Sequence, residues 1–200
     1  MLRKQLWPAI GMTLVLCVIT GLIYPGVVTA LAQVLFPREA NGSLVTVNGR
    51  IVGSELIGQT FTRPEYFHPR PSAAGSGYDA TASGGTNRGP TDAKLADTLI
   101  AQAIDSVVKS DGAVKGSIPS DMVTSSGSGL DPDISPANAR LQVPRVARAR
   151  GVPDATVAAV LARHILGRQF GFFGEPRVNV LLLNVALDSA FGAPRPVPDK

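Results

Sequence analysis

Two short segments rich in glycine and serine are the parts of this sequence most suggestive of chemistry. Residues 83–87 read Ser-Gly-Gly-Thr-Asn, and residues 125–129 read Ser-Ser-Gly-Ser-Gly. Backbone N–H groups in such loops can cradle a phosphate. A P-loop, however, also has a lysine and follows a strand, and neither segment has both features. We therefore interpret both segments as flexible or turn-forming loops that pack against the domain or against a partner.

The two histidines are the candidates for a general base. A serine nucleophile needs such a base beside it. His68 follows two aromatic residues in a long loop, so it is the better candidate. His164 lies on a predicted helix with an apolar face formed by Val157, Val160 and Leu161, which favours a packed or surface histidine. Neither histidine has neighbours at metal-ligand spacing, and we predict no catalytic or metal site.

Four arginines crowd one short segment: Arg140, Arg145, Arg148 and Arg150. The simplest interpretation is a solvated basic face. Pairing with Asp131 and Asp133, or contact with lipid headgroups, remains open. Arg145 could also supply positive charge to the loop at residues 124–132. The net charge of +4 is too small to indicate nucleic-acid binding.

A long uncharged run near the N-terminus determines where these residues can act. No charged residue lies between Lys4 and Arg38. A bilayer core needs about 20 apolar residues in a helix, so this run predicts a span at about residues 8–30, followed by an amphipathic stalk to residue 37. Because Arg3 and Lys4 precede it, we expect the N-terminus in the cytoplasm and residues 38–200 as one extracytoplasmic domain at the inner membrane.

A cleaved signal peptide is the alternative interpretation of this run. Ala30-Leu31-Ala32 fits a cleavage site, which would release a soluble secreted domain. Apolar residues continue beyond Pro25, however, which favours an uncleaved anchor. The only cysteine, Cys17, lies inside the run, so no intramolecular disulfide can form. Small residues recur along the span at a spacing that lets another membrane helix approach closely: Ala9, Thr13, Cys17 and Gly21.

The rest of the chain predicts an α+β domain, because helices and strands mix without regular alternation. Asn48-Gly49 predicts a hairpin over residues 44–52, and residues 61–90 predict a long, ordered irregular loop. Helices are predicted at residues 91–109 and 154–166, with a single helical turn at 119–123. Another helix should start at Ser135-Pro136, and Pro144 should kink or interrupt that helix. Residues 178–183 predict a buried strand. Residues 187–191 could form a strand or a helix, and residues 194–200 are expected to be a frayed tail.

Two asparagines interrupt or flank the last aliphatic run. Unpaired amides would be costly among Val178–Val185, so we expect Asn179 and Asn184 to hydrogen-bond backbone or loop groups. Both residues are therefore interpreted as structural.

Five ordered segments resemble the C subunit of the Kdp potassium-transporting P-type ATPase of bacteria, and the resemblance also covers the anchor. The segments are residues 58–73, 78–90, 126–135, 142–151 and 174–184. The residues that carry the resemblance, or that we expect at an interface, are Gly58, Gln59, Phe61, Arg70, Pro71, Ser72, Tyr78, Asp79, Ser83, Gly84, Gly85, Asn87, Gly89, Pro90, Gly127, Gly129, Asp131, Gln142, Arg145, Asn179 and Asn184.

The resemblance implies a non-catalytic accessory subunit that helps assemble a channel-like potassium-binding subunit and an ATPase subunit. ATP, Mg²⁺ and K⁺ would be handled by those partners. The resemblance also implies a raised nucleotide affinity of the ATPase subunit. Because the predicted topology leaves only residues 1–4 in the cytoplasm, where ATP is, we expect any such effect to be indirect. Asp133 departs from the family pattern, in which a histidine is expected. The alternative function is a membrane-anchored envelope enzyme or ligand-binding domain, with His68 and the glycine loops forming its site.

Overall fold

The computed structural model describes residues 2–194 and divides the chain into two compact units, Met1–Leu44 and Val45–Lys200. Each unit is described by itself. The predicted frayed tail lies, apart from Pro194, outside the described residues.

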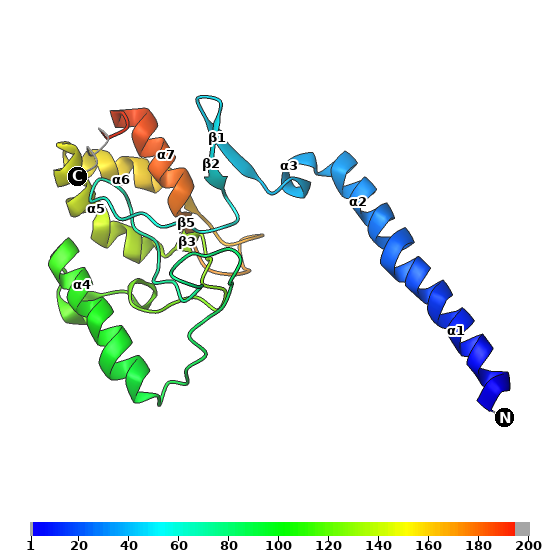
Figure 1. The fold of residues 1–200 in the computed structure, drawn as a ribbon. Coiled ribbons are helices and arrows are strands. Elements are labelled where there is room, and N and C mark those ends of the chain that lie inside the picture. Colours follow the sequence, from blue (N-terminus) through cyan, green and yellow to red (C-terminus); the bar gives the residue numbers. More distant parts are fainter. Residues whose placement is uncertain (1, 195–200) are drawn as a thin grey trace, which may run out of the picture. The chain divides into compact units, whose positions relative to one another are not determined.

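The first unit is a long helix followed by one short helix (Figure 1). The long helix consists of α1 (Leu2–Val18), a π-helical turn η1 (Ile19–Ile23) and α2 (Tyr24–Leu35), and α3 (Pro37–Ala40) follows. The π-helical turn has a local cause, because Pro25 has no N–H to donate to the carbonyl of Gly21. The helix Arg3–Leu35 is long enough to cross a membrane and contains an 18-residue window with a mean hydropathy of 2.2.

The second unit begins with the predicted hairpin, formed by β1 (Leu44–Val47) and β2 (Arg50–Ser54). Asn48 and Gly49 both have positive φ at its tip, as a tight hairpin turn requires. A separate antiparallel sheet has the strand order β3 (Asp133–Ile134), β5 (Arg177–Asn179), β4 (Ile165–Leu166). Its central residue Val178 pairs with Ile134 on one side and with Ile165 on the other.

Besides these strands, the described part of this unit contains helices. They are η2 (Lys94–Ile100), α4 (Ala101–Asp111), the short turns η3 (Lys115–Ser117) and η4 (Ser120–Met122), α5 (Pro136–Arg150), α6 (Asp154–Arg163) and α7 (Val180–Phe191). Both α5 and α7 pack against the central strand β5. The core joins α5, α6, α7 and the sheet, with Val146, Val157, Val178 and Leu183 fully buried. Ser135 caps α5 by accepting the N–H of Asn138, as the Ser-Pro start predicts. The α+β class is confirmed.

Three sequence expectations are wrong in detail. Of the two outcomes expected at Pro144, the interruption does not occur: α5 runs to Arg150, because its apolar face is buried and compensates for one lost hydrogen bond. The run 178–183 is not a strand: β5 ends at Asn179, whose side chain accepts the N–H of Leu182 and starts α7. The helix from residue 154 ends at Arg163, and Ile165 then joins the sheet.

The long segment 61–90 has no helix or strand and crosses the face of this core. Phe67 is fully buried within the core, so the loop is held to the domain as expected. The helix predicted at 91–109 is observed slightly displaced, as η2 and α4 ending at Asp111.

Candidate functional site

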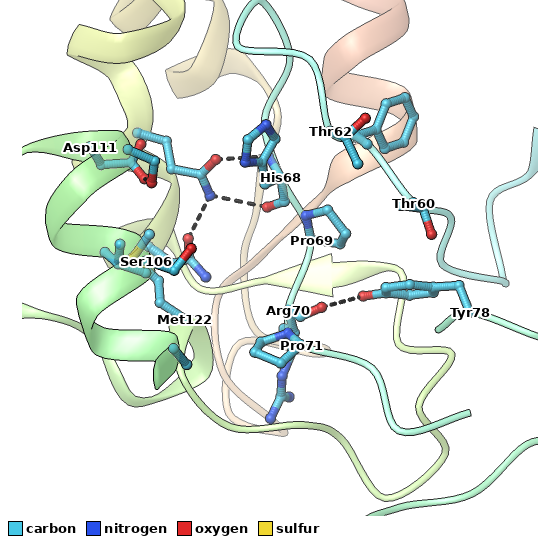
Figure 2. A pocket seen from close by; sticks show the side chains of 16 residues that line it. Thr60, Thr62, His68, Pro69, Arg70, Pro71, Tyr78, Ser106, Asp111 and Met122 are labelled. Atoms are coloured by element: carbon cyan, nitrogen blue, oxygen red, sulfur yellow. Dashed lines mark hydrogen bonds between the residues drawn. The ribbon is translucent and has the colours of Figure 1, made fainter. Parts of the chain in front are cut away.

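Residues of three signature segments, 58–73, 78–90 and 142–151, line a cavity of about 400 Å³ between the long loop, α4 and α5. Figure 2 shows His68, Pro69, Arg70 and Pro71 of the loop on one side of this cavity. Ser106, Asp111 and Met122 lie on the opposite side. Segments that are far apart in the sequence therefore share one site.

Two buried amides bind neighbouring residues of the long loop. The backbone N–H of Phe67 donates to Oδ1 of Asn184 at 2.8 Å, and Nδ2 of Asn184 donates to the Phe67 carbonyl at 3.0 Å. Gln142 makes the same pair of bonds with His68, at 2.7 and 3.0 Å. Each side-chain amide makes the two hydrogen bonds that a neighbouring β-strand would otherwise make with the loop backbone. The loop is therefore held by both α5 and α7. The hydrogen bonds expected between Asn184 and loop backbone groups are confirmed.

Arg145 is buried, which corrects the expectation of a solvated basic face at this position. Its Nε lies 2.7 Å from Oδ1 of Asp111, and its Nη1 donates to the carbonyls of Pro64 and Tyr66. Its Nη2 donates to Gln142, so the guanidinium fastens α4, α5 and the long loop together. Arg145 therefore supplies no charge to the loop at 124–132.

The other arginines divide between pairing and exposure. Arg150 is nearly buried and pairs with Asp188 at 2.8 Å, with its guanidinium over the ring of Tyr66. Arg140 and Arg148 are exposed. The suggested pairing of this cluster with Asp131 and Asp133 is wrong, because Arg70 pairs with Asp131 and Arg177 with Asp133, each at 2.9 Å.

Arg70 holds the second glycine-rich loop. Its Nη1 donates to Asp131, and its other guanidinium nitrogens approach the carbonyls of Thr124 and Ser125 at 3.4 Å. Burial raises the pKa of the Tyr78 hydroxyl well above its ordinary value, so it stays protonated and donates to the Arg70 carbonyl at 2.8 Å. Figure 2 shows this bond along the cavity wall.

Close backbone packing explains two of the signature glycines. A Cβ on Gly129, which has φ +67, would lie 2.6 Å from the Gly84 carbonyl oxygen and 2.7 Å from the Ala74 nitrogen. A Cβ on Gly58 would lie 2.5 Å from both the Asp131 carbonyl oxygen and the Tyr78 ring. Only glycine fits where these chains touch.

The hydroxyl of Ser72 connects three backbone groups at the same junction. It donates to the Gly129 carbonyl at 2.6 Å and accepts the N–H groups of Ala74 and Tyr78. The first and third signatures are thus joined through one small side chain.

The two glycine-rich loops pack against each other. The N–H of Gly84 donates to the Ser128 carbonyl at 2.8 Å, and Oγ of Ser83 donates to the same oxygen. A Cβ on Gly85 would lie 3.1 Å from the Gly127 carbonyl oxygen. Mutual packing of these loops agrees with their interpretation as turn-forming loops.

Several signature residues lie outside this junction. Asp79 accepts from Thr81, Asn87 has φ +52, and no atom within 4 Å would contact a Cβ on Gly89. Gln59 donates to the Val52 carbonyl, and Asn179 donates to the Glu55 carbonyl. These last two bonds tie the β1–β2 hairpin to the domain.

The titratable groups around the cavity are held by other groups of the domain. Burial is the main cause that lowers the pKa of His68, with the charge of Arg145 acting in the same direction. Its Nε2 lies 3.0 Å from the Arg63 carbonyl oxygen, which can only accept, so this nitrogen carries a hydrogen. Oδ1 of Asp111 binds Arg145, and Oδ2 accepts from Ser110. The polar atoms around the cavity are therefore largely committed to one another.

Asp133 stands where the family pattern leads us to expect a histidine. Burial raises the pKa of its carboxyl group, while Arg177 at 2.9 Å acts in the opposite direction. The carboxylate lies on β3 beside the sheet partner Asn179. Its ion pair with Arg177 links β3 to β5.

Sequence reasoning missed the acidic partners of this network. Asp111 ends α4 and pairs across 34 residues with Arg145. Asp121 binds the N–H and hydroxyl of Ser135 and the amide of Asn138, which secures the start of α5. Neither residue stands in a motif, so only the fold reveals them.

The small residues of the span lie in the first unit. The hydroxyl of Thr13 donates to the Ala9 carbonyl at 2.9 Å, so it needs no partner outside its own helix. Cys17 is exposed, and no atom within 4 Å would contact a Cβ on Gly21. These residues are open to another helix.

Comparison with known proteins gives a consistent result over nearly the whole chain. A family model described as "K+-transporting ATPase, c chain" matches residues 6–189. The protein named "Potassium-transporting ATPase KdpC subunit" of Gemmatimonas aurantiaca is 64% identical over 189 residues, covering 94% of both chains. The protein of the same name from Koribacter versatilis is 51% identical over 195 residues, covering 98% of this chain and all of its own. That of Geobacter sulfurreducens is 50% identical over 188 residues, covering 93% of this chain and 98% of its own.

Proposed function

Because this chain belongs to the KdpC family of potassium-transporting ATPase subunits, we propose that it is a non-catalytic subunit that holds such a pump together. The observation that carries this proposal is that the family match covers both the apolar helix and the folded unit. An assembly subunit needs both parts: a helix that meets membrane partners and a domain that meets their outer surfaces.

The internal hydrogen bonds of the domain support a role in binding rather than in chemistry. The long loop is hydrogen-bonded by the side chains of Arg145, Gln142 and Asn184. Such a network rigidifies a domain and fixes the shape that a partner would recognise. The partners in this proposal are the channel-like potassium-binding subunit and the ATPase subunit.

We propose that the chain lies in the inner membrane with its N-terminus in the cytoplasm. The basic pair Arg3-Lys4 before the apolar helix supports this orientation. Cysteine labelling tests it in a Cys17→Ser background. A cysteine at Asn48, exposed at the hairpin tip, should react with an impermeant reagent from outside the cell, and one at Gln5 should not. The reverse pattern would contradict the orientation.

We propose that ATP, Mg²⁺ and K⁺ are bound by the partner subunits. Three backbone donors at the two glycine-rich loops already have partners inside the domain: Gly84 N–H binds the Ser128 carbonyl, Gly129 N–H binds the Ser126 hydroxyl, and Leu130 N–H binds the Ser128 hydroxyl. Titration of the purified chain with millimolar Mg-ATP in a calorimeter should give no saturable heat. Saturable binding that Gly127→Val abolishes would contradict this part of the proposal.

The function itself is tested by ATP hydrolysis in solubilised membranes. Potassium-stimulated hydrolysis should be present when this chain is expressed with its partners and strongly reduced when the chain is omitted. Equal hydrolysis without the chain would contradict the accessory role.

A further inference from the structure

The hairpin between β4 and β5 carries three exposed phenylalanines. We call residues 167–174 the aromatic finger; it leads into β5 (Figure 1). Phe170 is 87% exposed, Phe172 65% and Phe173 57%, and the rings of Phe172 and Phe173 are 4.2 Å apart. Grouped exposed aromatic side chains of this size mark an interaction site rather than ordinary surface.

The aromatic finger is ordered by its own backbone. Gln169 and Phe173 form an antiparallel bridge with two hydrogen bonds of 2.9 Å. At its base, Ile165 and Leu166 pair with Val178 and Arg177 of the sheet. The rings are therefore presented on a fixed support, which lowers the entropic cost of binding a partner.

The backbone at the tip is unfavourable for phenylalanine. Phe170 has φ +52 and is followed by Gly171 with φ +83. The β1–β2 hairpin has nearly the same values, φ +50 and +77, but there the residues are Asn48 and Gly49, the pair that such turns prefer. A phenylalanine in this conformation costs stability, and exposure adds to the cost. A contact between the Phe170 side chain and an apolar surface would explain why phenylalanine occupies this position.

The charges of the aromatic finger favour a protein over a lipid surface. Arg168 and Glu175 face each other across its base at 2.8 Å, and Arg177 pairs with Asp133 at 2.9 Å. Segments that bind anionic lipid add unpaired lysines and arginines to their apolar residues. A neutral, aromatic, preformed projection instead resembles the centre of a protein–protein interface.

We propose that the aromatic finger inserts into an apolar pocket on a partner subunit of the same potassium-transporting ATPase. This inference rests on the proposed function, since it needs a pump subunit as its occupant. Phe172 and Phe173 fill the pocket together, and Phe170 extends the contact at the tip. The paired charges at the base form the polar rim of the contact.

Photo-crosslinking identifies the occupant directly. p-Benzoyl-phenylalanine is placed at Phe172 in the full complex in native membranes, with a matched probe at Val114, which is 75% exposed on another loop. We expect an adduct with a pump subunit from position 172 and none from position 114. A lipid adduct, an adduct with a second copy of this chain, or no adduct from position 172 would overturn the proposal.

Substitution then separates binding from folding. The double variant Phe172→Ser/Phe173→Ser should recover at least about tenfold less partner than wild type, while Val114→Ser should recover as much as wild type. Phe170→Asn restores the preferred Asn-Gly turn, so it should raise the melting temperature while lowering partner recovery. Unchanged recovery for the double variant would overturn the role of the aromatic finger. Failure of the wild-type chain itself to recover partners would instead refute the proposed function.

Discussion

Asn184 and Phe67 lie 117 residues apart in the chain and exchange two hydrogen bonds, at 2.8 and 3.0 Å, inside the domain core. Asn184 is on α7, and Phe67 is in the long loop. The side-chain amide thus takes the place of a neighbouring strand. Gln142 does the same for the next residue, His68.

Replacing Asn184 by leucine should lower the free energy of unfolding by about 1–3 kcal/mol, because the buried N–H and carbonyl of Phe67 would lose their partners. Thermal unfolding of the full chain in detergent measures the change. Ser189→Ala on the exposed side of the same helix is the control and should unfold like wild type. An unchanged melting temperature for Asn184→Leu would show that this amide does not hold the loop.

Sequence reasoning recognised the need of Asn184 for a partner but not the identity of that partner. An amide within an aliphatic run must be satisfied, and this follows from local chemistry alone. The choice of Phe67 depends on how the long loop crosses α7, which no local pattern encodes. Arg145 illustrates the same limit: its charge suggests solvent, and only the fold brings Asp111 and the loop carbonyls to it.

Two neighbouring glycines should respond very differently to alanine. Gly129→Ala should lower the free energy of unfolding by more than about 2 kcal/mol, because φ +67 is strained and the new Cβ would collide with Gly84 and Ala74. Gly127→Ala is the matched control, since no atom within 4 Å would contact its Cβ. Urea unfolding of both variants checks this, and equal destabilisation would contradict the packing of the two loops.

Acid should weaken the domain partly through His68. Burial lowers its pKa in the folded state below the ordinary value of 6.5, so the unfolded chain binds the proton more readily. The stability that neutral His68 contributes is present above about pH 6.5 and is lost as the pH falls through the lowered pKa.

Melting temperatures between pH 7 and pH 5 test the role of this histidine. The wild-type chain should lose more stability over this range than His68→Gln, which cannot titrate there. His164 is present in both proteins, so the two proteins differ only at residue 68. Parallel curves for the two proteins would refute the buried neutral histidine.

The small residues of the span should face a partner helix. Gly21→Leu would block close approach and reduce recovery of the assembled pump, whereas Leu14→Ile changes only side-chain shape and should be mild. Pull-down from detergent extracts compares the two variants. Equal recovery of the pump by the two variants would show that the small residues do not lie at the assembly interface.

The apolar helix and the β1–β2 hairpin were the easiest parts of the fold to predict, because hydropathy and Asn48-Gly49 act locally. The run at 178–183 was harder, because a short aliphatic segment suits either a strand or a buried helix. There the cap formed by Asn179 decides the outcome. The aromatic finger escaped sequence reasoning because the exposure of Phe170, Phe172 and Phe173 is a property of the folded chain alone.

The mass of the complex recovered with this chain tests the central claim most directly. The tagged full-length chain is purified from mildly solubilised membranes of cells that express the whole pump, and the product is weighed by native mass spectrometry. We predict a stoichiometric complex with the potassium-binding and ATPase subunits, and with the span of this chain intact. Recovery of the chain alone, folded and without those subunits, would contradict its assignment as an assembly subunit.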